Sequence, residues 1–149
     1  MLQARKVSWW RNSYQLVADG ELLATWTGRV WRGGGTVDLA GQRHEVAANA
    51  WSSRFEMTDE AGAVVAAADR VGRKRWTVAA DGRTYRFRRA SWWRSEELLD
   101  EAGQPVGSVR RVGWGGTAVA DLPGLSLPVQ VFVLVVALAK WEAQSAAAA

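Results

Sequence analysis

The residues of this sequence that are best suited to binding chemistry form a basic segment in its middle third. Between residues 70 and 94 the chain carries nine arginines and lysines, and Asp81 is the only acidic residue there. The net charge of the whole chain is only +4, so the rest of the sequence is mildly acidic. A guanidinium group can bond two oxygens of a phosphate or carboxylate at once, so the segment predicts an anion-binding face. Its basic residues are Arg70, Arg73, Lys74, Arg75, Arg83, Arg86, Arg88, Arg89 and Arg94.

The dipeptide Asp81-Gly82 predicts how these arginines are arranged. A two-residue Asp-Gly turn joins two antiparallel strands and fixes their register. The resulting hairpin pairs Arg75 with Arg88, Thr77 with Arg86 and Arg73 with Ala90 on one face, and it leaves an aromatic and apolar set on the other. Like charges directly across a ladder repel, so we expect Arg73, Arg75, Arg86 and Arg88 to bind an anionic partner. The alternative is a solvated face that only protects the sheet and keeps the protein soluble.

Other residues with catalytic or metal-binding potential give weaker patterns. His44 is the only histidine, so no histidine pair can bind a metal, and a surface position is favoured. Asp59-Glu60 and Asp100-Glu101 fall in predicted hairpin turns, where aspartate is expected for its bonds to the backbone. Gly33-Gly34-Gly35 lacks the lysine and helix of a phosphate loop and is interpreted as a strand connection. We therefore expect a protein that is not an enzyme and uses no metal or cofactor.

The elements that position these residues recur along the chain. Similar tetrapeptides surround Trp10, Trp51 and Trp93, which are 41 and 42 residues apart. Such a period indicates one supersecondary unit in three copies, here residues 7–48, 49–90 and 91–127. Each copy contains two predicted hairpins and hence four strands, which gives twelve strands in total. Pro123 and Pro128 cannot donate to a ladder, so the last strand of the third copy is expected to be short.

The tryptophans follow the same repeat. Six of the ten recur at corresponding places, and we expect them to fill the core: Trp10, Trp31, Trp51, Trp76, Trp93 and Trp114. Trp9 and Trp92 each precede another tryptophan on a predicted strand and so point to the opposite face. We expect one of those two to be exposed and able to enter a membrane interface.

A different element follows the strands. Residues 129–139 are apolar on all sides, which predicts a helix over about 128–142 followed by a disordered tail at 143–149. A spanning helix needs about 20 apolar residues, so a buried helix is favoured over a membrane anchor. Twelve strands tilted by about 40° close into a barrel with a backbone diameter of ~24 Å. A helix ~10–12 Å across fits that interior and fills the space that would otherwise be empty.

Length and composition fit one domain spanning residues 1–149. The chain is 48% hydrophobic, which is enough for a substantial core, and it contains no cysteine for disulfides, zinc thiolates or thiol chemistry. Arg5, Lys6 and Arg11 interrupt the N-terminal segment, so no signal peptide is expected. We expect a cytoplasmic protein that contacts the inner face of the membrane peripherally.

The recurring hairpins and the apolar 129–139 segment make the chain, from about Val7 to Trp141, similar to the tubby C-terminal-like superfamily. LURP-one-related proteins and phospholipid scramblases share that fold, in which a twelve-stranded antiparallel barrel encloses a hydrophobic helix. The resemblance implies binding of phosphoinositides or other anionic phospholipid headgroups at a membrane surface.

Three other functions remain open at this stage. The first is a structural or protein-interaction barrel whose basic face binds an acidic protein, and the second is a membrane protein anchored through residues 125–139. Nucleic acid is a third possible partner, but no RNP-like, KH or helix-turn-helix signature accompanies the basic segment.

Overall fold

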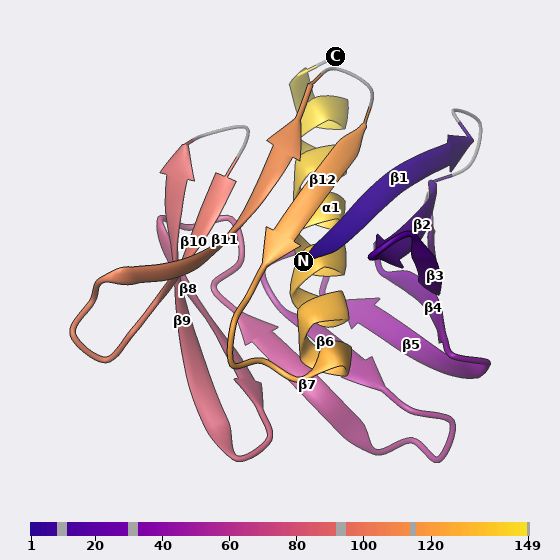
Figure 1. Ribbon diagram of the computed structural model, residues 1–149, viewed down its shortest axis with the longest axis horizontal. Coiled ribbons are helices and arrows are strands. Elements are labelled where there is room, and N and C mark those ends of the chain that lie inside the picture. Colours follow the sequence, from indigo (N-terminus) through magenta and orange to yellow (C-terminus); the bar gives the residue numbers. More distant parts are fainter. Residues whose placement is uncertain (9–11, 30–32, 92–94, 114–115, 149) are drawn as a thin grey trace.

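The computed structural model describes the chain except for residues 9–11, 30–32, 92–94, 114–115 and 149. Within those limits it is a closed barrel of twelve antiparallel strands around one C-terminal helix, as the sequence predicted (Figure 1). The elements are β1 (Leu2–Ser8), β2 (Ser13–Ala18), β3 (Glu21–Gly28), β4 (Gly35–Leu39), β5 (Gln42–Ala48), β6 (Phe55–Thr58), β7 (Val64–Asp69), β8 (Arg75–Ala80), β9 (Arg83–Ser91), β10 (Ser95–Leu99), β11 (Pro105–Val112), β12 (Thr117–Asp121) and α1 (Leu127–Ala148).

Strand β1 was not predicted from the sequence. Each strand pairs with its neighbours in sequence, and β1 also pairs with β12 to close the barrel. Residues 91–127 contain only three strands within the described part of the chain, and no strand follows Asp121. The expected fourth strand of the third copy is therefore wrong, because Pro123 and the start of α1 leave no segment able to pair there. The N-terminal segment supplies the twelfth strand instead.

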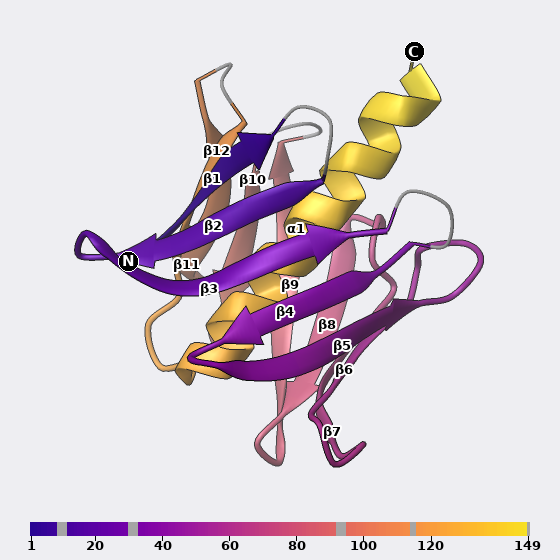
Figure 2. The same ribbon diagram turned by 90° about the vertical axis from the view of Figure 1, so that its right-hand side faces the viewer.

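The interior of the barrel is filled by the helix. Val129 and every residue from Val131 to Leu138 are buried, with at most 3% of each exposed. The helix is surrounded by strands, so it needs no polar face, which explains why residues 129–139 are apolar on all sides (Figure 2). One helix in the described chain is long and apolar enough to cross a membrane, namely this one, and 61% of that span is buried inside the barrel.

The helix extends further than the sequence predicted. It begins at Leu127 and continues to Ala148, so the expected disordered tail at 143–149 is wrong for residues 143–148. Alanine has the highest helix propensity of any residue, and no glycine or proline follows Pro128 to end the helix. The backbone therefore continues as helix beyond the part that the barrel covers.

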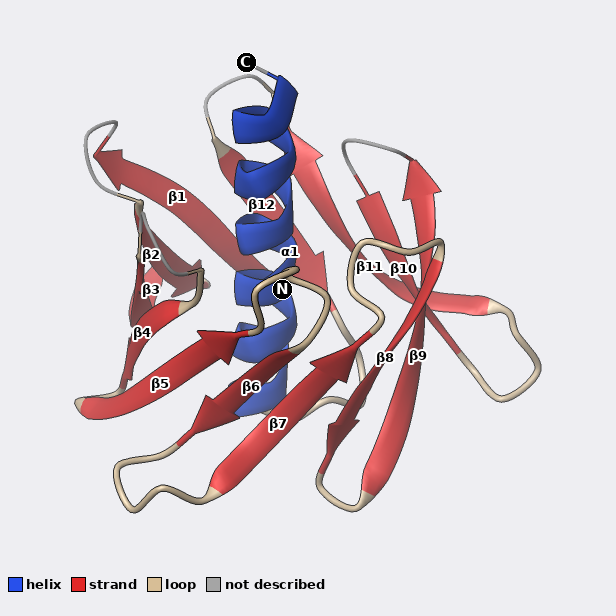
Figure 3. Cartoon of the chain, turned by 180° about the vertical axis from the view of Figure 1, so that it is seen from behind, coloured by secondary structure: helices blue, strands red, loops and turns tan. Residues whose placement is uncertain are grey.

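The barrel has two ends of different character. Strands β1, β3, β5, β7, β9 and β11 all finish at the end where α1 also finishes, and we call this the loop end (Figure 3). At the opposite end, the turn end, the connections include the tight turns Asp19-Gly20, Ala40-Gly41 and Asp81-Gly82. Both residues of each of these turns have positive φ, a conformation that glycine and aspartate tolerate better than most residues.

The repeated tryptophans were expected to fill the core, and the structure describes two of the six. The prediction is confirmed for one of these two. Trp76 is buried and stacks on Phe87, with ring centroids 4.5 Å apart. Trp51 was expected in the core, but it lies in the connection between β5 and β6 and is 87% exposed. A position that falls in a connection need not face the barrel interior, which is why the repeat misplaced it. The expectations for Trp9, Trp10, Trp31, Trp92, Trp93 and Trp114 fall outside the described residues.

Candidate anion-binding surface

The predicted hairpin of the basic segment is confirmed. In the β8–β9 ladder Arg75 lies opposite Arg88, Thr77 opposite Arg86 and Trp76 opposite Phe87. Asp81 and Gly82 form the turn, with φ values of 54° and 70°. The rings of Trp76 and Phe87 face the core, so Arg75, Arg86 and Arg88 share the outer face of the sheet.

Two of these arginines already have acceptors inside the protein. Arg88 pairs with Glu97 of β10 at 3.1 Å, and Arg86 donates to the backbone carbonyl of Asp100 at 2.7 Å. An external anion would have to share or replace these acceptors. The like-charge contact between Arg75 and Arg88 is thus partly relieved by Glu97, which belongs to a strand outside the predicted hairpin.

Arg73 does not lie on the ladder. Strand β8 begins at Arg75, and Arg73 sits in the β7–β8 connection, where its amide donates to the carbonyl of Arg70 at 3.1 Å. The predicted pairing of Arg73 with Ala90 is therefore wrong, because Arg73 is still in the turn before β8, and the bonding to β9 begins at Lys74, whose carbonyl accepts from the Arg89 amide at 2.7 Å. Arg73 and Arg75 are exposed and have no ion pair or side-chain hydrogen bond within the described residues.

The remaining basic residues of the segment are dispersed. Arg70 and Lys74 are exposed in the same connection as Arg73, whereas Arg83 is exposed beside the turn. Arg89 is half-buried and lies opposite Glu96 in the β9–β10 ladder. Arg94 falls outside the described residues. The group Arg70, Arg73, Lys74 and Arg75 is accordingly exposed at the loop end of the β8–β9 hairpin, whereas Arg83 lies at its turn end.

A buried ion pair joins α1 to the barrel wall behind this hairpin. Lys140 donates to Glu96, and both side chains are almost completely buried. Burial raises the pKa of the Glu96 carboxyl above its usual value, although the Lys140 ammonium and the Arg89 guanidinium pull it in the opposite direction. No local pattern predicts this contact, because Glu96 lies between Ser95 and Glu97 in β10 and nothing distinguishes it from an exposed acid.

A second polar cluster surrounds Glu142 at the loop end of α1. The Glu142 carboxylate accepts a hydrogen bond from Tyr14 Oη at 2.5 Å and forms an ion pair with Lys6 at 3.1 Å. Burial raises the pKa of Glu142, but these two donors and the charges of Lys6 and Arg111 outweigh it, so the net pKa is lowered. The pKa of the Tyr14 hydroxyl is raised, chiefly by burial and then by its bond to Glu142. These contacts attach α1 at Glu142 to the paired strands β1 and β2.

The acidic pair at Asp59 and the single histidine, His44, make contacts that belong to the fold. Asp59 accepts backbone hydrogen bonds from Ala61 and Ala63 at 3.0 and 2.9 Å, as expected for turn chemistry. His44 was expected at the surface, but it is 6% exposed because it lies opposite Val37 on the inner face of the ladder. Among the described residues, no group of three or more histidine, cysteine or acidic side chains could hold a metal ion.

A pocket of about 300 Å³ opens at the loop end between α1 and the ends of β2, β3 and β6. Trp26, Phe55 and Ala139 form its apolar part. Its charged residues are already paired, since Glu142 bonds to Lys6 and Arg29 forms an ion pair with Glu45. The pocket therefore offers no unpaired charge for a ligand in the part of the chain that the structure describes.

Comparison of the chain with protein-family models, curated proteins and solved structures gave no match.

Proposed function

We propose that this protein is a non-enzymatic module that binds anionic lipid headgroups at a membrane surface. The observation that carries the proposal is a set of exposed basic side chains that have no partner among the described residues, at the loop end of the β8–β9 hairpin: Arg70, Arg73, Lys74 and Arg75. Natural surfaces usually intersperse both charge signs, and the β7–β8 connection contains no acid. The resemblance to tubby-like barrels, drawn from the repeated hairpins and the apolar helix, supports the same class of ligand.

The contacts rank the four arginines predicted from the sequence. Arg73 and Arg75 are free to bond phosphate oxygens, whereas Arg86 and Arg88 would first have to leave Asp100 and Glu97. We therefore infer that Arg73 and Arg75 make the direct contacts, and that Arg86 and Arg88 add mainly to the positive field around them.

Vesicle co-sedimentation tests the proposal with two matched double variants. Each basic residue near an anionic membrane contributes about 1 kcal/mol, so Arg73→Gln with Arg75→Gln should weaken binding by roughly 30-fold. Arg86→Gln with Arg88→Gln removes the same charge but should weaken binding less. The assay compares neutral vesicles with vesicles containing phosphatidylserine or a phosphoinositide, each at two salt concentrations.

Failure to pellet with any anionic vesicle at low salt would refute the proposal. Binding to an acidic protein would then become the better explanation of the basic surface. Equal losses in the two double variants would refute the ranking of the arginines while leaving lipid binding intact.

A further inference from the structure

The two ends of the barrel carry opposite charge in their connections. At the turn end the six connections contain no lysine or arginine, and their acidic residues are Asp19, Asp59, Glu60, Asp81, Asp100 and Glu101. At the loop end the described parts of the connections contain no acid, and their basic residues are Arg29, Arg54, Arg70, Arg73 and Lys74. A molecule with this polarity is oriented by a negatively charged surface, with its loop end toward that surface.

Among the described residues of the loop end, Trp51 is the most exposed large apolar side chain. It is 87% exposed, whereas tryptophan side chains in soluble proteins are mostly buried. Tryptophan is the residue that membrane proteins concentrate at the headgroup level, because its ring is apolar and its N–H still finds a polar partner. Its position next to basic connections is thus suited to a membrane interface.

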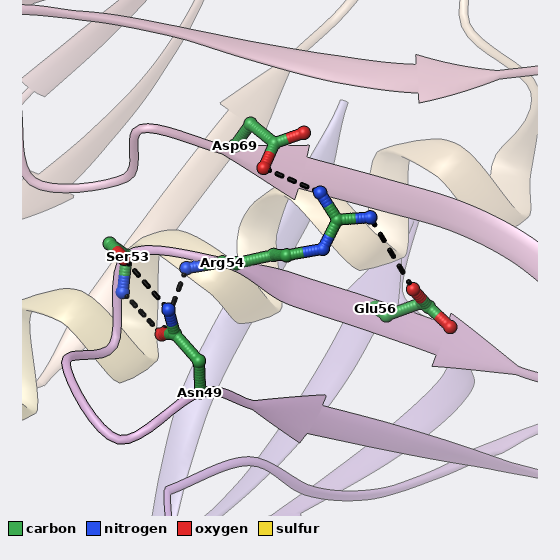
Figure 4. Close-up of polar contacts among 5 residues, drawn as sticks. All are labelled: Asn49, Ser53, Arg54, Glu56 and Asp69. Carbon is green, nitrogen blue, oxygen red and sulfur yellow. Dashed lines mark hydrogen bonds and ion pairs between the residues drawn. The ribbon is translucent and has the colours of Figure 1, made fainter.

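Hydrogen bonds hold the connection that carries Trp51 in one conformation. Asn49 Oδ1 accepts from the amides of Ser53 and Arg54 at 2.8 and 3.1 Å, and Asn49 Nδ2 donates to Ser53 Oγ at 2.9 Å (Figure 4). The amide of Ser52 also donates to the carbonyl of Asn49 at 3.0 Å. Hydrogen bonds on both sides of Trp51 therefore hold its backbone in place in the unbound protein.

The same connection is attached to the basic β7–β8 connection. The amide of Val71 donates to the carbonyl of Ser53 at 2.9 Å, and Val71 itself is buried. Arg54 pairs with Asp69 at 2.7 Å and with Glu56 at 3.7 Å, which ties β6 to β7 and uses the charge of Arg54 internally (Figure 4). Trp51 and the exposed Arg70, Arg73 and Lys74 are consequently parts of one bonded unit.

We propose that the protein docks end-on, with its loop end against the anionic membrane and Trp51 inserted at the headgroup level. The inference rests on the proposed function and names the surface and the orientation that binding uses. Arg70, Arg73, Lys74 and Arg75, the first residue of β8, supply the electrostatic attraction, and Trp51 supplies the apolar contact. The acidic turn end faces away from the membrane. A side-on orientation through the outer face of β8–β9 is the competing geometry.

The absence of cysteine allows the orientation to be measured with single labelled sites. Three exposed alanines provide matched positions: Ala50 beside Trp51, Ala61 in a connection at the turn end, and Ala79 on the outer face of β8. Each is changed to cysteine in turn and labelled with the fluorophore NBD. The labelled proteins are then mixed with phosphatidylserine vesicles that contain brominated phospholipids as quenchers.

End-on docking predicts a blue shift and bromolipid quenching for the label at Ala50→Cys only. Quenching at Ala79→Cys but not at Ala50→Cys would establish the side-on geometry, and quenching at Ala61→Cys would reverse the orientation. Either result overturns the inference while leaving the proposed function intact if the vesicles still pellet the protein. If anionic vesicles do not pellet it, the proposed function and the inference fail together.

A pair of substitutions tests the apolar contact separately. Trp51→Ala should weaken vesicle binding by about tenfold, because the membrane no longer covers the indole surface. Leu22→Ala removes an exposed apolar side chain at the turn end and should leave binding unchanged. Trp51 makes few contacts within the fold, so both variants should keep the unfolding midpoint of the parent protein. Equal binding by Trp51→Ala and the parent would overturn the insertion of Trp51.

Discussion

At the residue scale, the most consequential contact is the buried pair of Glu96 and Lys140. Removing two charges from water is costly, and their mutual attraction offsets that cost only when both partners are present. The raised pKa of Glu96 reflects the same cost, because burial favours the neutral carboxyl. The pair joins β10 to the half of α1 that approaches the loop end, where apolar packing gives way to polar contacts.

Lys140→Met should destabilise the fold by about 3–5 kcal/mol, because it leaves the Glu96 carboxyl in the interior without its ion-pair partner. Combining it with Glu96→Met should restore most of that loss. Denaturant unfolding of the two single variants and the double variant measures the coupling between the residues. A double variant no more stable than Lys140→Met would contradict this account.

The pH dependence of the same variant follows from the sign of the shift. A carboxyl whose pKa is higher in the folded state stabilises the fold fully below its unfolded pKa, and this stabilisation is lost as pH rises through the folded pKa. Lys140→Met should therefore gain stability on acidification relative to the double variant, whose interior has no group to protonate.

At the element scale, the β8–β9 hairpin keeps a repulsive pair in its ladder. Arg75 and Arg88 are directly opposite, and within the described part of the chain Arg88 has an acidic partner whereas Arg75 has none. Cross-strand like charges oppose pairing, so an arginine at position 75 is not what stability alone would select. Retaining it is consistent with a role in binding.

Arg75→Thr should raise stability by about 0.5 kcal/mol, because it removes the repulsion and introduces a residue that favours strands. The same variant should bind anionic vesicles less well. Ala79→Thr on the same outer face controls for strand propensity, and it should leave vesicle binding unchanged. A loss of stability in Arg75→Thr, measured as a lower urea midpoint, would show that Arg75 has a structural role instead.

At the scale of the whole molecule, closure of the barrel depends on its first strand. The seam between β1 and β12 is formed by Leu2, Gln3 and Ala4 opposite Ala120, Val119 and Ala118. Lys6 of the same strand contacts Glu142, so β1 also fixes the end of the helix. A barrel without β1 would have two unpaired edges and an uncovered apolar helix.

Deleting residues 1–8 should consequently give an aggregating chain that binds the hydrophobic dye ANS. Deleting residues 146–149 is the matched truncation at the other terminus, beyond Trp141 and Glu142, and it should leave the unfolding transition nearly unchanged. Size-exclusion chromatography and thermal unfolding distinguish the two outcomes. A monomeric, cooperatively folded 9–149 chain would show that β1 is dispensable.

The sequence by itself determined the elements whose signals are local. Hydrophobic alternation, Asp-Gly turns and the apolar 129–139 segment predicted strands, the β8–β9 register and an enclosed helix, because each signal depends on neighbouring residues only. Tertiary structure alone decided which segment supplies the twelfth strand, since β1 and β12 are more than a hundred residues apart. It also decided that Arg88 pairs with Glu97 and that Arg86 donates to the carbonyl of Asp100. The burial of His44 and the exposure of Trp51 were decided in the same way. These outcomes depend on which strands become neighbours and where a connection points, and neither is encoded in local residue patterns.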